Sequence, residues 1–124
     1  MERAPHPASV EFLEFLADIS DPATGEIRAK RLASRLGLTE SELYQVWSAR
    51  ENHVSWAIFV DEVLSVLDVV QDVTQDLEST VHWFQREPIP AFNMKTAQRV
   101  VATGGARTLV ALIKRQEIEI SAKG

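Results

Sequence analysis

The sequence has no cysteine and little glycine or proline, with five of each in 124 residues. The absence of cysteine excludes disulfides, thiolate nucleophiles and cysteine-based zinc or iron–sulfur sites, and it fits a reducing compartment. So few glycines and prolines leave little room for the many tight turns of a β-sandwich. The composition of the whole sequence, 45% hydrophobic and 25% charged, is ordinary for a globular protein. These proportions favour an all-α fold.

Long apolar runs are also lacking. No uninterrupted apolar segment approaches the ~20 residues that span a bilayer, and the first ten residues carry no cationic-then-apolar signal. We therefore expect a soluble, cytoplasmic protein with no membrane partner. A length of 124 residues predicts one compact domain, or two small ones that share a core.

Positive charge is missing from the middle of the chain. The net charge is −5, but it divides into −3 over residues 1–53, −6 over 54–84 and +4 over 85–124. The total speaks against nucleic-acid binding, which depends largely on cations that meet phosphates. The division is typical of a chain that binds a partner or itself. We expect an N-terminal region, residues 1–53, and a second region, residues 54–124.

Apolar periodicity predicts helices in the N-terminal region. One begins after Ser9, which is expected to be its N-cap, and ends at the turn residues 21–25. A short helix with a basic outer face should then end at Gly37. Thr39, with Glu42 three residues later, predicts a capping box that opens the next helix.

A short helix, a glycine and a second helix form the layout of a helix-turn-helix. Acidic side chains at the exposed start of the second helix, Glu40 and Glu42, would repel phosphates and oppose DNA binding. The alternative is that the basic residues of 28–35 solvate a surface helix. If DNA is bound, the candidate contacts are Ser41, Gln45, Ser48 and Arg50.

Residues 54–84 contain neither glycine nor proline and predict a long, central apolar helix. Its apolar surface is so wide that the helix should lie in the centre of the fold or pack on a second copy, and we expect a homodimer. A break is expected near residues 73–76, where Thr74 or Asp76 could cap a new helix. The opposite, solvated face should carry four aspartates, namely Asp61, Asp68, Asp72 and Asp76.

Turn residues organise the rest of the chain. Prolines at 88 and 90 should end the preceding helix and force an extended loop. Thr96 should cap a short helix over residues 97–102, the glycines at 104 and 105 should stop it, and a last helix should span 106–115. The alternating tail, residues 117–120, could add an edge strand or lie across a partner.

No residue pattern indicates catalysis, a metal or a cofactor. The three histidines, His6, His53 and His82, lack ligand spacing. Helical spacing places the aspartates on the solvated face, where they are poor candidates for an acid–base pair. Gly104 and Gly105 lack the pattern of a phosphate-binding loop. We expect a protein that is not an enzyme, with no catalytic residues and no cofactor.

The run VHWFQREPIPAFNMKTAQRVVATGGARTLVALIKR resembles the C-terminal toxin-binding domain of the Xre/MbcA/ParS antitoxin family. That domain has a tryptophan–apolar pair, a proline-containing loop with an apolar anchor, a Thr-Pro helix start, a glycine and a final amphipathic helix. The matching residues are Trp83 with Phe84, Pro88 to Phe92, Thr96, Gly104, and Val110 with Leu112 and Ile113.

The sequence departs from the family pattern at two places. Ala97 replaces the proline after the threonine, a mild change because the first helical position favours proline but tolerates alanine. Val73 and Thr74 stand where relatives often have a glycine. The resemblance covers about residues 56–115, and residues 29–50 look like the family's degenerate helix-turn-helix.

The resemblance implies a two-part antitoxin, with an N-terminal operator-binding unit and a C-terminal unit that binds a cognate toxin. RES-type toxins of the family are similar to ADP-ribosyl-transfer enzymes and consume NAD⁺, and the antitoxin blocks their active site. The expected partners are therefore a RES-type toxin and operator DNA. Candidate toxin contacts are two apolar anchors and three cations, namely Ile89, Phe92, Lys95, Arg99 and Arg107.

Two other interpretations remain. One is a solitary helix-turn-helix transcription regulator whose C-terminal part only dimerises. The other is an α-helical scaffold or adaptor with neither activity. Core packing is the simpler explanation for several apolar residues of the C-terminal region, namely Trp83, Phe84, Val100 and Leu112.

Overall fold

The structure is a computed structural model that describes residues 7–120. These residues form helices joined by short loops, with no strand and only two isolated β-bridges, so the expected all-α class is confirmed. The helices are α1 (Pro7–Ile19), α2 (Ala29–Arg35), α3 (Glu40–Ser48), α4 (Trp56–Thr74), α5 (Leu77–Arg86), α6 (Ala97–Ala102) and α7 (Ala106–Lys114), with a 3₁₀ turn, η1 (Pro90–Phe92), before α6.

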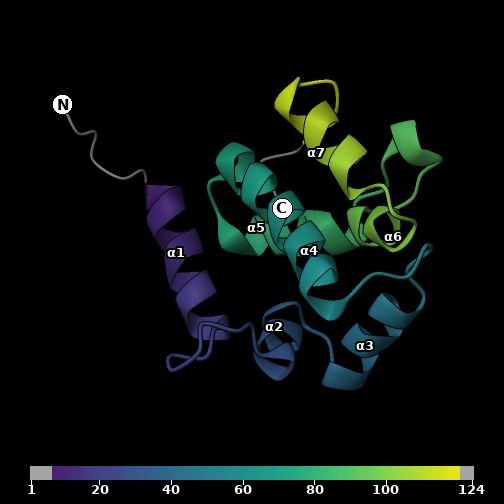
Figure 1. Ribbon diagram of the computed structural model, residues 1–124. Coiled ribbons are helices and arrows are strands. Elements are labelled where there is room, and N and C mark those ends of the chain that lie inside the picture. Colours follow the sequence, from purple (N-terminus) through teal and green to yellow (C-terminus); the bar gives the residue numbers. More distant parts are fainter. Residues whose placement is uncertain (1–6, 121–124) are drawn as a thin grey trace.

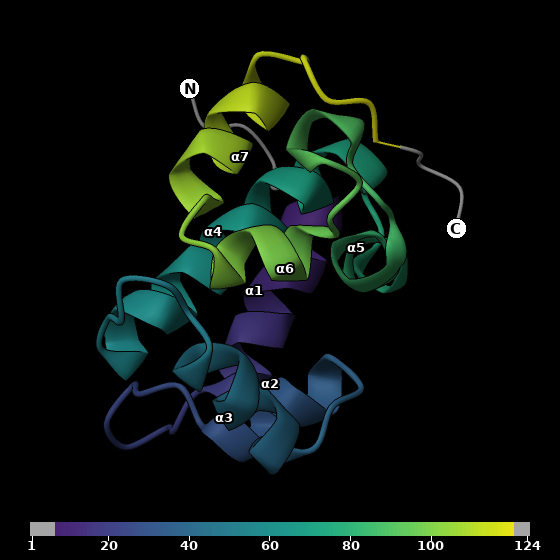
Figure 2. The same cartoon turned by 90° about the vertical axis from the view of Figure 1, so that its right-hand side faces the viewer.

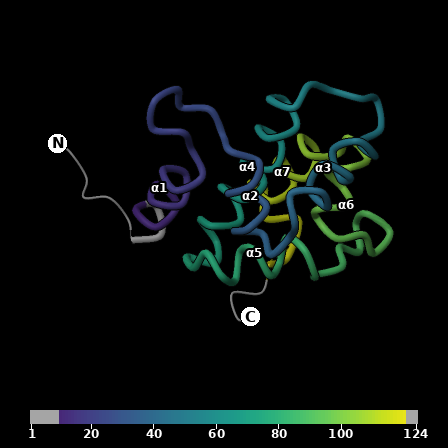
Figure 3. The backbone as a smooth tube through the Cα atoms, turned by 90° about the horizontal axis from the view of Figure 1, so that it is seen from below, coloured from purple at the N-terminus to yellow at the C-terminus, as the bar shows by residue number. Residues whose placement is uncertain are grey.

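Helix α4 is the hub of the fold, and it contacts α1, α5, α6 and α7. Helices α1 and α6 lie on opposite sides of it (Figures 1 and 3). The pair α2 and α3 lies at one end of the molecule, and α7 lies at the other (Figure 2). One hydrophobic core runs through all of these helices, from Phe12 to Ile113, so residues 7–53 and 54–120 share it. No helix of the described residues has the length and apolarity needed to cross a membrane.

Helix α1 begins at Pro7, so the prediction that Ser9 is its N-cap was wrong. Proline suits the first turn of a helix, because its fixed φ is helical and its missing N–H would have no intrahelical partner there. The inner face of α1 buries Phe12, Phe15 and Ile19. His6 lies outside the described residues.

The turn between α2 and α3 is built as its residues predict. Gly37 adopts φ +73°, a left-handed conformation that glycine accepts without strain. The capping box is confirmed, because the Glu42 N–H donates to Thr39 Oγ1 (3.0 Å) and the Thr39 N–H donates to Glu42 Oε1 (2.8 Å). The basic face of α2 is held to α1 by ion pairs from Arg31 and Arg35 to Asp18 (3.2 and 3.0 Å).

The predicted break after α4 is confirmed. Gln75 adopts a left-handed φ of +60°, and Asp76 rather than Thr74 caps α5 by accepting from the Ser79 N–H (2.9 Å). The Ser79 hydroxyl also donates to this carboxylate, and the two hydrogen bonds hold the pKa of Asp76 below its ordinary value. Gln75 takes here the left-handed position that glycine occupies at many helix ends, at a cost of about 1–2 kcal/mol.

A buried polar cluster joins α1 to this break. Gln71 is only 1% exposed. Its amide donates to Glu11 Oε1 (3.1 Å), and its carbonyl accepts from the Thr80 hydroxyl (2.9 Å). Glu11 Oε1 also accepts from the Leu77 N–H (2.8 Å). The carboxylate of α1 thereby satisfies one of the free N–H groups at the start of α5.

The C-terminal elements also begin and end near their predicted residues. Thr96 caps α6 by accepting from the Arg99 N–H (3.3 Å), and Gly104 follows α6 with φ +85°. The loop before α6 is not fully extended, because η1 forms one 3₁₀ turn in it. Helix α7 ends at Lys114, and the tail forms no strand as far as Ile120.

The four aspartates are exposed, as predicted. Partial burial and the nearby Asp72 raise the pKa of Asp68, while Lys114 acts in the opposite direction. A carboxyl whose folded-state pKa is raised binds its proton more tightly in the folded state. The ionised form of Asp68 therefore costs stability above the folded-state pKa, and this cost disappears as the pH falls below the unfolded-state pKa.

We expect Asp68→Asn to raise the free energy of unfolding by about 0.3 kcal/mol at neutral pH, since changes at exposed positions are small. The gain should vanish near pH 3, where the wild-type carboxyl is largely protonated. Urea unfolding at the two pH values measures the difference. Asp61→Asn on the same helix is the control, and an equal gain there would contradict a specific effect of Asp68.

Candidate functional site

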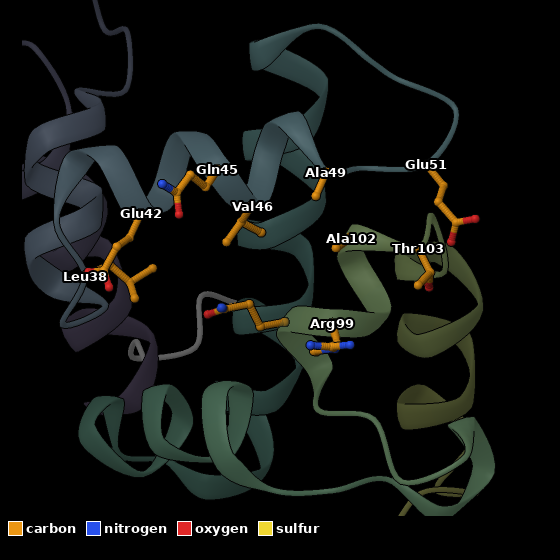
Figure 4. A pocket seen from close by; sticks show the side chains of 10 residues that line it. Leu38, Glu42, Gln45, Val46, Ala49, Glu51, Arg99, Ala102 and Thr103 are labelled. Carbon is orange, nitrogen blue, oxygen red and sulfur yellow. The ribbon is translucent and has the colours of Figure 1, made fainter.

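A cleft of about 500 Å³ lies between α3 and α6. In Figure 4, Gln45 and Val46 of α3 form one wall, and Arg99 and Ala102 of α6 form the other. The lining of the cleft is partly apolar, and charged and polar side chains lie around its rim. The cleft therefore brings together residues that are far apart in the sequence and that belong to different predicted sites.

The end of α3 is fastened to the end of α6, which fixes the width of the cleft. The Glu51 N–H donates to the Ala102 carbonyl (2.8 Å). Two guanidinium nitrogens of Arg50 donate to the carboxylate of Glu62 on α4, Nε at 3.0 Å and Nη2 at 2.6 Å. This hydrogen bonding raises the pKa of Arg50. Its Nη1 also donates to the backbone carbonyls of Glu51 and Asn52.

Arg50 is therefore a structural residue. Its side chain is only 8% exposed, and the turn between α6 and α7 covers it closely. A Cβ added at Gly104 would lie 3.2 Å from Arg50 Nη1. A guanidinium held in this way is not free to reach DNA, so the candidate DNA contacts reduce to Ser41, Gln45 and Ser48, which are all exposed on α3.

The rim of the cleft carries charges of both signs. Glu42 and Glu51 come from the α3 side and Arg99 from the α6 side. None of the three side chains forms an ion pair with any residue in 7–120. The carboxylate of Glu42 is partly engaged, because it caps the Thr39 N–H. The cleft therefore presents one free cation and a free carboxylate beside an apolar surface.

The candidate toxin contacts separate into two groups. Ile89 is 2% exposed, and its N–H donates to the Lys95 carbonyl (2.9 Å), so it is a core residue of the loop and not a surface anchor. Phe92 is half-buried and lies 3.7 Å from the position of a Cβ added at Gly105. The three cations are exposed and form no ion pair within the described part of the chain, but only Arg99 lines the cleft.

Within the described residues, no three histidine, aspartate or glutamate side chains are placed so that together they could hold a metal ion. His82 is exposed on α5, and the ring of His53 packs against Trp47 at 5.3 Å.

No protein-family model, curated protein or solved structure that was compared with the chain matches it.

The sequence did not predict an aromatic cluster that forms where α3 meets the start of α4. Rings from α3, the following loop and the start of α4 form an aromatic cluster, in which the ring of Trp56 lies 5.2 Å from that of Tyr44 and 5.5 Å from that of Trp47. The Trp47 indole N–H donates to the Val54 carbonyl (2.8 Å). The i, i+3 spacing of Tyr44 and Trp47 placed them on one side of α3, but nothing in the sequence indicated that Trp56 packs against them.

Proposed function

We propose that this chain is a non-enzymatic antitoxin that binds a RES-type, NAD⁺-consuming toxin and inhibits it by covering the active site. The order of elements from α5 to α7 supports the proposal, because it follows the order in the antitoxin family that the sequence resembles. Trp83 and Phe84 are buried on α5, a proline loop follows, Thr96 caps α6, and a glycine turn precedes an amphipathic last helix.

The observation that carries the proposal is the free guanidinium of Arg99 at the α3–α6 cleft. An exposed arginine beside apolar surface is the combination that interface hot spots favour, because its planar group pairs with carboxylates or stacks on aromatic rings. Lys95 and Arg107 flank α6 in the sequence and add exposed positive charge. A toxin surface with acidic groups around an apolar protrusion would be complementary to this arrangement.

A charge reversal tests this proposal. We expect Arg99→Glu combined with Arg107→Glu to weaken the toxin complex by about 30-fold or more, since reversing two interface cations removes attraction and adds repulsion. Co-expression with the product of the adjacent toxin gene, followed by a pull-down, measures the complex, and restored growth arrest reports lost neutralisation. Lys30→Glu combined with Arg86→Glu, the same double charge reversal at two exposed positions outside the cleft, is the matched control. If the wild-type chain forms no complex with any RES-type neighbour, the proposal is wrong.

A second candidate function is that of a transcription regulator with a helix-turn-helix formed by α2 and α3. The observation in its favour is that Ser41, Gln45 and Ser48 follow one another at i, i+4 and i+7 and are exposed. These side chains are suited to base edges and phosphates. A sequence-specific gel shift that weakens steeply with salt, with no toxin gene nearby, would favour this function over the first.

A further inference from the structure

A second groove lies beside the proline loop, and no residue of α6 lines it. It has a volume of about 460 Å³ and runs between the end of α5, the loop over residues 88–94 and the tail residues 117–119. In Figure 2 the tail leaves the top of α7 and returns toward α5. Prolines and other apolar residues line the groove, among them Met94, whose side chain is 59% exposed.

The loop holds Met94 at this position through an uncommon backbone. Asn93 and Met94 have φ values of +56° and +65°, a region that L side chains enter at a cost of about 1–2 kcal/mol each. Hydrogen bonds within the loop stabilise it, including one from the Met94 N–H to the Ile89 carbonyl (2.9 Å). The exposed thioether is therefore presented on a closed, well-bonded loop.

Trp83 supplies the first indication of a ligand. It lines the groove and is 2% exposed, and its indole N–H is the buried side-chain polar group without a hydrogen-bond acceptor in the described residues. A buried donor left without an acceptor costs about 1–3 kcal/mol. A phenylalanine at this position would fill the core without an unpaired N–H, so core packing alone does not require a tryptophan here. An acceptor that enters the groove would remove it.

The charges of the groove supply the second indication. Its ionisable lining residues are all glutamates, Glu87, Glu117 and Glu119, and all three are exposed. Within residues 7–120, these glutamates form one ion pair, a long one of 4.0 Å between Glu117 and Arg115. Three carboxylates beside apolar surface complement a segment that carries lysine or arginine, whose aliphatic stems would cover the prolines and Met94.

We propose that this groove binds a short basic segment of a partner protein, with a main-chain carbonyl of the segment accepting from the Trp83 indole N–H. The lysine or arginine side chains of the segment pair with the three glutamates, and its apolar residues pack on the proline loop. This site is opposite in charge to the cationic surface around Arg99. It does not depend on the antitoxin proposal, and it can be tested without any toxin.

Titration of the ¹⁵N-labelled full chain with an acetylated, amidated KLKLK peptide tests the site. We expect the indole cross-peak of Trp83 to move downfield as its N–H gains an acceptor, while the cross-peaks of Trp47 and Trp56 stay in place. Binding should be at least 10-fold tighter than that of the matched ELELE peptide. No shift at Trp83, or equal binding of the two peptides, would overturn the proposal.

Two variants measure separately how much the glutamates and the Trp83 indole N–H contribute to peptide binding. Replacing all three groove glutamates by glutamine should weaken KLKLK binding by about 10-fold. The control changes three exposed glutamates outside the groove to glutamine, Glu14, Glu40 and Glu78, and should leave binding unchanged. Trp83→Phe should weaken binding by about fivefold, as expected for one lost hydrogen bond. If the control variant weakens binding as much as the groove variant, the peptide senses only net charge and the site is refuted.

Discussion

Arg50→Ala is expected to lower the free energy of unfolding by about 3 kcal/mol, because it leaves the carboxylate of Glu62 partly buried without its partner. Two nitrogen–oxygen contacts between the groups would be lost, at 3.0 and 2.6 Å. The backbone carbonyls of Glu51 and Asn52 would lose a donor as well. The connection between α3, α4 and the turn after α6 would then be weakened in one step.

Urea unfolding followed by far-UV circular dichroism measures this loss. Arg31→Ala is the matched control, because Arg31 pairs with Asp18 at 3.2 Å with both side chains exposed, and such pairs contribute about 1 kcal/mol or less. The double variant Arg50→Met with Glu62→Leu should recover much of the loss, since apolar replacement of a buried pair is often neutral. A cost for Arg50→Ala no larger than that for Arg31→Ala would show that the pair is not structural.

Phe59→Ala should be the most destabilising single truncation of α4, at about 4 kcal/mol. The ring is fully buried and lines a small void directly beneath the α3–α6 cleft, together with Val46 and Phe84. Removing it would enlarge that void under Val46, which also lines the cleft. The lost free energy of unfolding would therefore have two parts, the transfer free energy of the removed ring and the cost of the cavity that it leaves.

The neighbouring residue provides a control for this truncation. Ile58 is half-exposed on the same turn of α4, and Ile58→Ala should cost less than about 1 kcal/mol. If Phe59→Ala leaves too little folded protein, Phe59→Leu should still unfold at lower urea than wild type, with a cost of about 1–2 kcal/mol. Equal costs at the two positions would contradict the assigned orientation of α4.

Helix ends are the part of this fold that the sequence predicts best. The capping box at Thr39, the break capped by Asp76 and the cap at Thr96 depend on residues within three or four positions of one another. Such interactions need no knowledge of the tertiary fold. The start of α1 was misplaced because both Pro7 and Ser9 are suitable near a helix N-terminus, and local chemistry does not choose between them.

Side chains that act across the fold were not predictable in the same way. Arg50 follows the three other candidate DNA contacts of α3, and its sequence context gives no sign that Glu62, twelve residues later, binds its guanidinium. Ile89 lies between two prolines and was expected to project from the loop. The hydrogen bonds that close the loop turn it into the core instead. The α3–α6 cleft could not be predicted for the same reason, because it depends on how α6 packs on α4.

The polar cluster that fastens α1 has a consequence for the newly synthesised chain. Glu11 lies 60 residues before Gln71 and 66 residues before Leu77, its two partners. Helix α1 packs on α4 and α5 as well as on α2, so until α4 and the start of α5 have left the ribosome, Phe12 and Phe15 lack much of their packing surface and remain available to chaperones and proteases. Synthesis of α4 and the first turn of α5 is therefore the point in translation after which the nascent chain can bury its N-terminal helix fully.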